Sequence, residues 1–257
     1  MASSARDIAS RIASASAEEL DALLERYRDD PRKQVAHALE RALEARASLR
    51  AEELRVARLY DFQRERGGTG IVLGVDEVGR GAVAGPLTVC AVALPSEPHI
   101  LGIDDSKRLT PKRRGEIAAR IEGHASALGI CHIPPEVIDR IGMSRALREA
   151  MADAIGRTGV EPDHVLIDGN PVHVHPRETC IVKGDSKVAA IAAASIVAKV
   201  ARDALMDELD AVYPGYAFAK SKGYASREHI DAIRRKGLTP VHRATFCGNF
   251  IEGPRLF

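Results

Sequence analysis

Short apolar runs alternate with longer amphipathic stretches over most of the chain. Residues 71–75 and 87–94 are rich in Val, Leu and Ala, which predicts two buried strands, and Gly85-Pro86 between them favours an antiparallel return. Similar runs predict further strands at 127–133, 164–167 and 179–183. Helical patterns with capping residues are predicted at 110–125, 135–141, 144–156, 186–209 and 226–236. Strands that alternate with helices in this way predict an α/β fold.

Residues 1–69 differ, because they contain charged side chains, Leu and Ala but no run that predicts a strand. Ser16 and Glu19 form a capping box that starts one helix, and Asp30-Pro31 predicts the start of a second helix that Gly67-Gly68 ends. We therefore expect an N-terminal helical hairpin, followed by a second domain at 70–257. The hairpin packs on that domain or forms a dimer contact in one interpretation, and clamps duplex nucleic acid in the other.

Composition narrows the class of protein. The 257 residues are 45% hydrophobic, which suffices for a large core, and the net charge is +1. Any nucleic-acid binding must therefore use a local basic surface. The four cysteines are widely spaced, and the chain has neither an apolar run that would span a membrane nor the apolar region of a secretory signal near its start. We expect a cytoplasmic protein with reduced thiols.

Four carboxylates follow or begin predicted elements. Asp76 and Glu77 follow the first strand, Asp168 ends the 164–167 strand, and Asp185 precedes the longest helix of this domain. Ligands of α/β sheets gather at the carboxyl ends of strands, so we expect one acidic cluster. Hard divalent cations are the natural counter-charge for carboxylates that repel one another. The Gly79-Arg80-Gly81 turn should break the pleat and let Asp76 and Glu77 share that site.

A dinucleotide-binding site is the main alternative for residues 79–85, which match a loose GxGxxxG pattern after a strand. That site requires a helix next, whose N-terminal amides bind pyrophosphate. The residues that follow, LTVCAVAL, predict a strand instead, and the two carboxylates would repel phosphate. The residues around this glycine pattern therefore argue against a dinucleotide-binding site.

Six stretches in order resemble the type 2 ribonuclease H family, ribonuclease HII. They are DEVGRG (76–81), DDSKRL (104–109), LIDGN (166–170), VKGDSK (182–187), AAASIVAKVARD (192–203) and KGYASREH (222–229). The resemblance covers roughly residues 70–257. It implies a ribonuclease H-like mixed sheet flanked by helices.

The resemblance also implies an activity and its residues. The enzyme would cleave the RNA strand of RNA–DNA hybrids and incise duplex DNA 5′ of an embedded ribonucleotide, with two Mn²⁺ or Mg²⁺ ions per site and 3′-hydroxyl and 5′-phosphate products. Its catalytic residues and metal ligands would be Asp76, Glu77, Asp168 and Asp185. Its substrate contacts would be Gly79, Arg80, Gly81, Lys107, Ser195 and Tyr224.

Several of these residues have a plainer interpretation when they are taken alone. Lys107 suits a solvated loop charge, Ser195 a hydrogen-bonded hydroxyl in the core, and Tyr224 core packing. Only the resemblance favours substrate contact for Lys107 and Ser195. His173 and His175 lie two residues apart, but without a third ligand nearby we interpret them as surface residues and not as a metal site.

Two other classes of function remain as alternatives. A nucleic-acid-binding module without catalysis would not need the four carboxylates. A metal-dependent phosphoesterase for small molecules would not need the basic positions Lys107, Lys187, Lys199, Lys222 and Arg227. We expect a monomer that acts on hybrids and on ribonucleotide-containing duplex DNA, without a membrane, and with a replication clamp as an open candidate partner.

Overall fold

The computed structural model describes residues 4–251. The chain divides into two compact units, Met1–Arg55 and Val56–Phe257. Their boundary falls inside helix α3 (Lys33–Gly67), before the domain boundary that the sequence predicts after residue 69. Val56 and Tyr60 explain this position, because both are buried in the core of the second unit.

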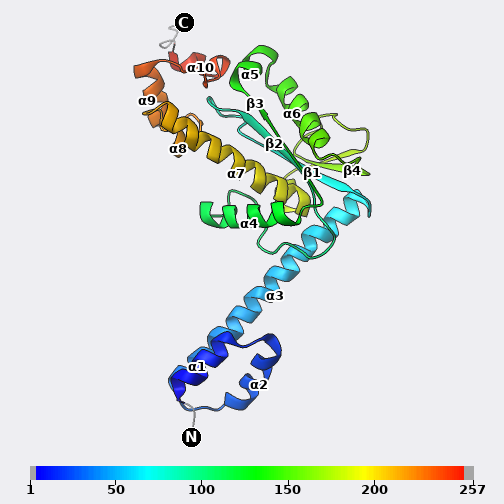
Figure 1. The fold of residues 1–257 in the computed structure, drawn as a ribbon, viewed down its shortest axis with the longest axis vertical. Helices are drawn as coiled ribbons and strands as arrows, with labels where there is room; N and C mark the ends of the chain where they lie inside the picture. The colour runs from blue at the N-terminus through cyan, green and yellow to red at the C-terminus, as the bar shows by residue number, and fades with distance from the viewer. Residues whose placement is uncertain (1–3, 252–257) are drawn as a thin grey trace. The chain divides into compact units, whose positions relative to one another are not determined.

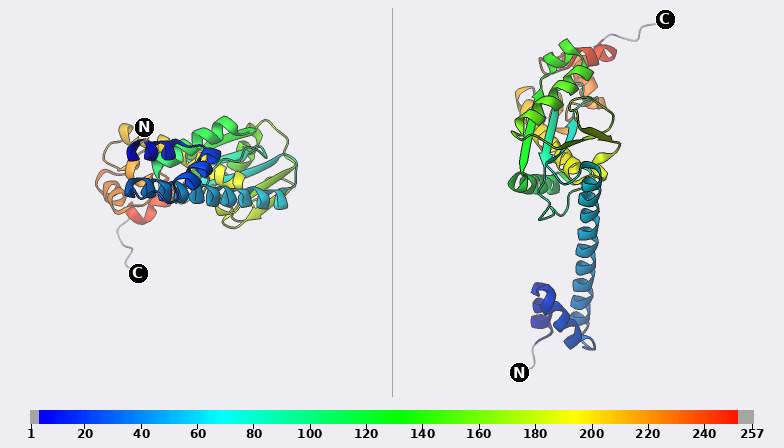
Figure 2. Two further views of the ribbon diagram at one scale, coloured as in Figure 1. Left: turned by 90° about the horizontal axis from the view of Figure 1, so that it is seen from below. Right: turned by 90° about the vertical axis from the view of Figure 1, so that its right-hand side faces the viewer.

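The first unit is helical, and Figure 2 shows α1 (Ala5–Ser14) and α2 (Ala17–Tyr27) beside the first part of α3. The predicted capping box begins α2: the Ser16 hydroxyl accepts a hydrogen bond from the Glu19 N–H, and the Glu19 carboxylate accepts one from the Ser16 N–H at 2.9 Å. The unit's apolar core contains Ile8, Ile12, Leu20, Leu23, Val35 and Leu39.

The predicted hairpin is wrong in two details. The sequence reasoning missed α1, which begins with a second capping box at Ser4 and Asp7. Helix α3 begins at Lys33 and not at Pro31. The Asp30 carboxylate accepts hydrogen bonds from the Arg32 guanidinium, at 2.5 and 2.8 Å, and from the Arg32 N–H at 3.0 Å, before the helix begins.

The second unit contains the five-stranded mixed sheet (Figure 1). Its strands are β1 (Val72–Val78), β2 (Leu87–Ala93), β3 (Ala127–Ile133), β4 (His164–Asp168) and β5 (Glu178–Ile181), in the spatial order β3-β2-β1-β4-β5. Strands β1, β2 and β3 pair antiparallel, whereas β1, β4 and β5 pair parallel. The carboxyl ends of β1, β4 and β5 therefore lie at one edge of the sheet.

Helices cover both faces of this sheet (Figure 1). Helices α5 (Pro135–Ile141) and α6 (Met143–Arg157) lie on one face, and α7 (Ala189–Val212) lies on the other with α4 (Pro111–His124) beside it. Helix α7 crosses β1 at Gly74, where an added Cβ would come 2.2 Å from the Ala190 backbone. Glycine at this position permits the close approach of α7 to β1, the strand that carries Asp76 and Glu77.

Helices near the C-terminus form a smaller cluster around the end of α7. They are α8 (Phe218–Ser221), α9 (Arg227–Lys236) and α10 (Ala244–Ile251), and their apolar side chains pack with Val83 and Met206. An isolated bridge pairs Ala84 with His242. This packing brings the glycine-rich turn after β1 against the segment before α9.

Element boundaries differ from the prediction near the carboxylates. Strand β1 continues through Asp76 and Glu77, which pair with Cys90 and Val89, so the pleat does not break until after Val78. Helix α7 begins at Ala189 and not at residue 186, because residues 184–186 form a separate 3₁₀ turn. Among the described residues, no helix is long and apolar enough to cross a membrane.

Candidate active site

The sheet register brings the predicted carboxylates together. Val75 of β1 lies opposite Ile167 of β4, so Asp76 and Asp168 follow side by side at the same edge. Asp168 lies opposite Ile181 of β5, and the chain then turns through Gly184 into Asp185. The parallel pairing of three strands thus gathers residues that are more than 100 positions apart in the sequence.

Asp76 is the most enclosed of these carboxylates. One of its oxygens accepts a hydrogen bond from the Glu77 N–H at 2.7 Å, and the Ser195 hydroxyl favours its charged form by lowering its pKa. Burial is the main reason that the pKa of Asp76 lies well above its usual range, and the neighbouring charges of Glu77 and Asp168 raise it further. A buried carboxylate whose charged form is this unfavourable is suited to a bound cation.

The other three carboxylates have different surroundings. Burial and the charge of Asp168 raise the pKa of Glu77, although Arg80, 3.5 Å from its carboxylate, opposes that shift. Burial, followed by the charges of Asp105 and Asp168, raises the pKa of Asp185. Asp168 accepts a hydrogen bond from the Gly184 N–H at 2.6 Å, which ties β4 to the turn that carries Asp185.

The donor set fits a hard divalent cation. All four side chains offer oxygen ligands, and the negative charge of Asp168 contributes to the raised pKa of Asp76, Glu77 and Asp185. Within residues 4–251, however, no three His, Cys, Asp or Glu side chains already stand as a group that could hold a metal ion. The structure brings the carboxylates to one edge without closing them into a ligand shell.

The glycine turn after β1 presents two exposed residues and one buried residue. Arg80 and Gly81 are exposed, and an added Cβ at Gly81 would meet nothing within 4 Å. Gly79 is buried with φ +85°, and an added Cβ there would come 2.1 Å from Arg202 Nε. Only the Arg80 and Gly81 part of the turn is open to a ligand, whereas Gly79 lets the turn pack on Arg202.

Lys107 and Ser195 lie near the acidic edge in different ways. The Lys107 side chain is 80% exposed, and its ammonium lies 3.9 Å from the Asp185 carboxylate. Ser195 is buried in α7. Its hydroxyl lies 3.0 Å from the hydroxyl of Ser106, the residue before Lys107. Lys107 is therefore free to meet an anion near Asp185, whereas the Ser195 hydroxyl already has partners within the protein.

Tyr224 is 40% exposed, so the interpretation as a core residue is wrong. Its ring lies 5.7 Å from the Arg202 guanidinium, measured to the ring centroid. The backbone of this segment is held by a hydrogen bond, because the Tyr224 carbonyl lies 2.9 Å from His229 Nδ1. The aromatic face is thus available to a ligand beside the glycine turn.

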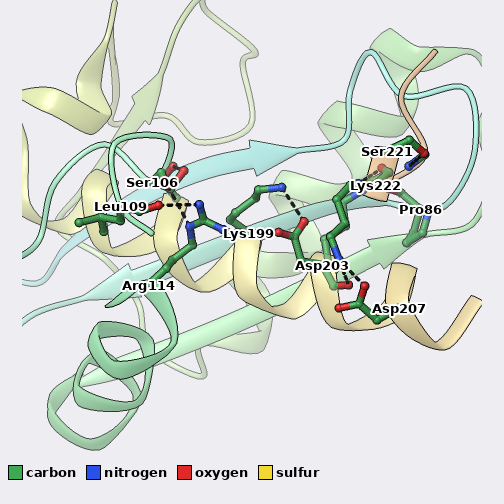
Figure 3. A network of polar contacts seen from close by, with 12 residues as sticks. Pro86, Ser106, Leu109, Arg114, Lys199, Asp203, Asp207, Ser221 and Lys222 are labelled. Atoms are coloured by element: carbon green, nitrogen blue, oxygen red, sulfur yellow. Dashed lines mark hydrogen bonds and ion pairs between the residues drawn. The ribbon is translucent and has the colours of Figure 1, made fainter. Parts of the chain in front are cut away.

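Two of the predicted basic positions are held by ion pairs along α7 (Figure 3). The Lys199 ammonium lies 2.5 Å from Asp203, which also pairs with Arg114 at 3.5 Å. Lys222 pairs with Asp207 and donates to the Asp203 carbonyl at 3.3 Å. Lys222 thus joins the segment after α8 to α7, whereas Lys199 pairs within α7, and both are much less exposed than Lys107.

Sequence reasoning missed two arginines behind the glycine turn. Arg202 and Arg243 are both fully buried, and their guanidinium groups donate hydrogen bonds to main-chain carbonyls. Arg202 lies within the AAASIVAKVARD stretch (192–203) that resembles the family, and Arg243 lies near the C-terminus, within VHRATF (241–246). A buried Arg has no periodic signal in the sequence that separates it from a surface Arg.

His173 and His175 lie in a loop around Glu178. The Glu178 carboxylate accepts hydrogen bonds from the N–H groups of His173, Val174 and His175, at 2.8, 2.7 and 3.2 Å. These bonds explain why Glu178 has a lowered pKa although burial opposes it. The segment is a loop folded around one carboxylate.

Solved structures with a similar fold define the class of this protein. Ribonuclease H2 from Pyrococcus horikoshii OT3 has a TM-score of 0.59 and 26% identity, covering 68% of this chain and 92% of that chain. The RNase HII in the PCNA complex from Archaeoglobus fulgidus has a TM-score of 0.62 and 26% identity, covering 71% and 98%. Bst-RNase HIII in complex with Mn²⁺, at 21% identity and a TM-score of 0.57 over 72% of this chain and 69% of that chain, shares the fold. The second unit is thus a ribonuclease H-like α/β nuclease.

Sequence comparisons narrow this class to one family. The family model "Ribonuclease HII" matches residues 73–249, and the model "Ribonuclease HII N-terminal domain" matches residues 4–66. Ribonuclease HII of Geobacillus kaustophilus (strain HTA426) is 43% identical over 225 residues, which are 87% of this chain and 86% of that relative. Ribonuclease HII of Geobacter sulfurreducens is 46% identical over 193 residues, 74% and 89% of the two chains.

The chain belongs to the ribonuclease HII family, whose enzymes hydrolyse RNA in RNA–DNA hybrids. The predicted family, the ribonuclease H-like fold and the endoribonuclease activity are confirmed. Enzymes of the ribonuclease H family depend on divalent metal ions.

Proposed function

We propose that this enzyme incises duplex DNA on the 5′ side of an embedded ribonucleotide, as well as the RNA strand of hybrids, and leaves 3′-hydroxyl and 5′-phosphate ends. One observation carries the proposal. The carboxyl ends of β1, β4 and β5 place Asp76, Glu77, Asp168 and Asp185 at one edge, beside a turn with exposed Arg80 and Gly81. Metal-binding carboxylates next to a phosphate and sugar site are what such a nuclease requires.

Asp76, Glu77, Asp168 and Asp185 are the residues that would hold two Mn²⁺ or Mg²⁺ ions. Such ions supply an activated water and charge stabilisation for the leaving 3′-oxygen. Asp76 is assigned as the ligand shared by both ions, because it is the buried carboxylate between Glu77 and Asp168. Asp185, which lies 3.9 Å from the exposed Lys107 ammonium, is assigned to the side of the attacking water.

The remaining residues bind and orient the substrate in this proposal. The Arg80 guanidinium and the Lys107 ammonium hold phosphates on either side of the scissile bond, because both side chains are largely exposed. Main-chain groups at Arg80 and Gly81 meet the ribonucleotide sugar, where the 2′-hydroxyl distinguishes RNA from DNA, and the buried Gly79 lets the turn take this position. Tyr224 stacks on the next sugar, and Ser195, whose hydroxyl has partners within the protein, orients Asp76.

The test uses three duplexes of one sequence: all DNA, DNA with a single ribonucleotide, and an RNA–DNA hybrid. With Mn²⁺ or Mg²⁺, we expect cleavage of the second and third only, and the 5′ fragment should be extendable by a DNA polymerase because it ends in a 3′-hydroxyl. Asp76→Asn should abolish cleavage and retain duplex binding, since its carboxylate serves the metal and the basic residues serve the phosphates.

Two outcomes would contradict the proposal. Cleavage of the hybrid but not of the single-ribonucleotide duplex would limit the enzyme to continuous RNA. Asp76→Asn activity within about tenfold of the wild type would remove that carboxylate from the metal site, since loss of a shared metal ligand costs far more.

Partners form a separate part of the proposal. RNase HII of Archaeoglobus fulgidus has been solved as a complex with PCNA. We propose that this chain acts as a monomer in the cytoplasm and that a replication clamp is a candidate partner. Light scattering of the purified protein, alone and mixed with the clamp of its own organism, tests both statements.

A further inference from the structure

The strongest unexplained feature is Arg202, a fully buried cation on α7. Its three guanidinium nitrogens donate to three different carbonyls: Nε to Pro86 at 2.8 Å, Nη1 to Lys222 at 2.7 Å and Nη2 to Ala84 at 3.1 Å. Two of these carbonyls follow the glycine turn, and the third belongs to the segment that carries Tyr224. One planar group therefore joins two segments that are far apart in the sequence.

The two segments also contact each other directly through their backbones. The N–H groups of Val83 and Ala84 both donate to the Gly223 carbonyl, at 2.9 and 3.1 Å. Gly223 has φ +78°, and an added Cβ would come 2.3 Å from the Ala84 oxygen. This approach leaves no room for a side chain, so the spacing between the segments is fixed closely.

Arg202 contacts both of the proposed substrate elements as well. Gly79 packs directly against its guanidinium, and the Tyr224 ring lies over it, 5.7 Å from centroid to Cζ. The exposed part of the glycine turn and the exposed aromatic ring thus rest on the same buried group. A change in the orientation of the Arg202 guanidinium would therefore move the Tyr224 ring relative to the glycine turn.

We propose that Arg202 is a positioning residue that holds Tyr224 at a fixed distance from the Gly79–Gly81 turn and thereby sets the preference for a ribonucleotide followed by DNA over continuous RNA. This inference rests on the proposed function. Discrimination between the two substrates depends on how closely Tyr224 approaches the sugar that follows the ribonucleotide, because an extra 2′-hydroxyl there must be excluded by the ring. A ring that is no longer held would accept both sugars.

Arg243 offers a matched control. It is also fully buried, but its guanidinium donates to the Gly85 carbonyl at 2.9 and 3.1 Å and to the Arg80 carbonyl at 3.1 Å. Arg243 therefore binds two carbonyls of the same segment, at Arg80 and Gly85, whereas Arg202 joins that segment to the one that carries Tyr224. Loss of Arg243 should impair both substrates alike.

The experiment compares kcat/KM on a single-ribonucleotide duplex and on an RNA–DNA hybrid of the same sequence, for the wild type, Arg202→Lys, Arg202→Gln and Arg243→Lys. We expect both Arg202 variants to lower the junction-to-hybrid ratio at least about fivefold, the equivalent of one lost hydrogen bond. The lysine variant keeps the charge but not the three directed bonds, so it should behave like the glutamine variant. Arg243→Lys should lower both efficiencies and leave the ratio unchanged.

A loss of stability alone must be separated from this effect. Tyr216→Phe removes the hydrogen bond from the Tyr216 hydroxyl to the Gly237 carbonyl, 2.9 Å long, within the same apolar cluster. It destabilises that cluster without touching either segment, and its ratio should equal that of the wild type. Assays are run well below the Tm of every variant, with folding verified by circular dichroism.

Three results overturn the inference: an unchanged ratio in folded Arg202→Lys and Arg202→Gln, an equal change in Arg243→Lys, or an equal change in Tyr216→Phe. The proposed function fails differently. A wild-type enzyme that does not incise the single-ribonucleotide duplex refutes that function, whereas a wild type that cleaves both substrates with an Arg202-independent ratio refutes only the role of Arg202.

Discussion

The Ser195 hydroxyl lies 3.0 Å from the Ser106 hydroxyl, and it lowers the pKa of the buried Asp76 carboxylate against the larger effect of burial. Ser195→Ala removes the hydroxyl that favours the charged form of Asp76, and a polar interaction with a charged group contributes on the order of 2 kcal/mol. We expect kcat to fall about tenfold at saturating Mn²⁺ while the KM for the hybrid stays unchanged, because the carboxylate loses its orientation. Steady-state kinetics measures both constants.

Ser106→Ala is the matched control for this prediction. It removes the other partner of Ser195 but leaves the bond to Asp76, so kcat should stay within about threefold of the wild type. A raised KM with unchanged kcat in Ser195→Ala would instead mean that its hydroxyl serves the substrate and not the orientation of Asp76.

Asp185→Asn should stabilise the metal-free protein. Burial and the charges of Asp105 and Asp168 raise the folded-state pKa of Asp185, so its ionisation favours the unfolded state. Its unfavourable effect is absent below the unfolded pKa of about 4 and develops as pH rises through the folded pKa. In EDTA at pH 7.5, the variant should gain on the order of 1 kcal/mol over the wild type, measured by urea unfolding.

Two further measurements check that interpretation. The gain should shrink at pH 4.5, where the wild-type carboxyl is becoming neutral, and Mn²⁺ should raise the Tm of the wild type more than that of the variant. A variant that is less stable than the wild type in EDTA at pH 7.5 would show that the pairing of Asp185 with Lys107 outweighs the repulsion.

The buried pair His229 and His242 predicts a loss of stability in acid. Their Nε2 atoms lie 3.1 Å apart, and burial followed by the charge of His229 lowers the pKa of His242 to about 4. Burial also lowers the pKa of His229. Because the unfolded chain binds protons at about pH 6.5 and below, the folded state should lose on the order of 2 kcal/mol as pH falls from 6.5 toward 4.

Urea unfolding at pH 7 and pH 5 measures this effect, and His242→Gln is the comparison. The glutamine cannot be protonated, so the variant should lose less stability than the wild type between these two pH values, even if it is less stable at pH 7. Equal losses in both proteins would assign the acid sensitivity to other groups.

Local signals account for most of the elements. Strand β2, strand β3, helix α5 and helix α9 agree with the sequence to within a residue, because each begins or ends at Pro, Gly or a capping Ser. The carboxylate edge was also predictable, since each acidic residue follows a short apolar run. Whether these carboxylates and the substrate residues have their assigned roles stays a prediction.

Long-range contacts account for what the sequence did not predict. The misplaced start of α3 is the exception, because the contact there is local: the Arg32 guanidinium binds the Asp30 side chain two residues away, which the capping pattern does not reveal. Arg202 and Arg243 were missed because their partners are main-chain carbonyls more than 100 positions earlier, apart from Lys222. Main-chain acceptors leave no trace in a list of side chains, so these two residues are found only in three dimensions.

The position at which the N-terminal helices can be removed is the last prediction. The second unit begins at Val56, and its core includes Val56, Leu59 and Tyr60 of α3. The Tyr60 hydroxyl accepts a hydrogen bond from the Ile100 N–H at 3.2 Å. Gln63 Oε1 accepts one from the Ala190 N–H at 2.7 Å, at the start of α7, where helix N–H groups need a partner. The last turns of α3 are therefore part of the catalytic unit.

Deletion of residues 1–55 should leave a folded enzyme with wild-type kcat, whereas deletion of residues 1–66, which ends at the glycine pair just before the predicted boundary, should not. The longer deletion removes three buried side chains, at about 1.5–3 kcal/mol each, and two hydrogen bonds at about 1 kcal/mol each, a sum comparable to the whole stability of a typical domain. Circular dichroism melts and kcat on the hybrid at saturating concentration compare the two deletions. Gln63→Ala in the chain without residues 1–55 should lower the Tm by several degrees and so isolate the cap on α7. If the chain without residues 1–66 melts at the same temperature as the chain without residues 1–55, the last turns of α3 contribute nothing to the catalytic unit, and its boundary lies at the glycine pair after all.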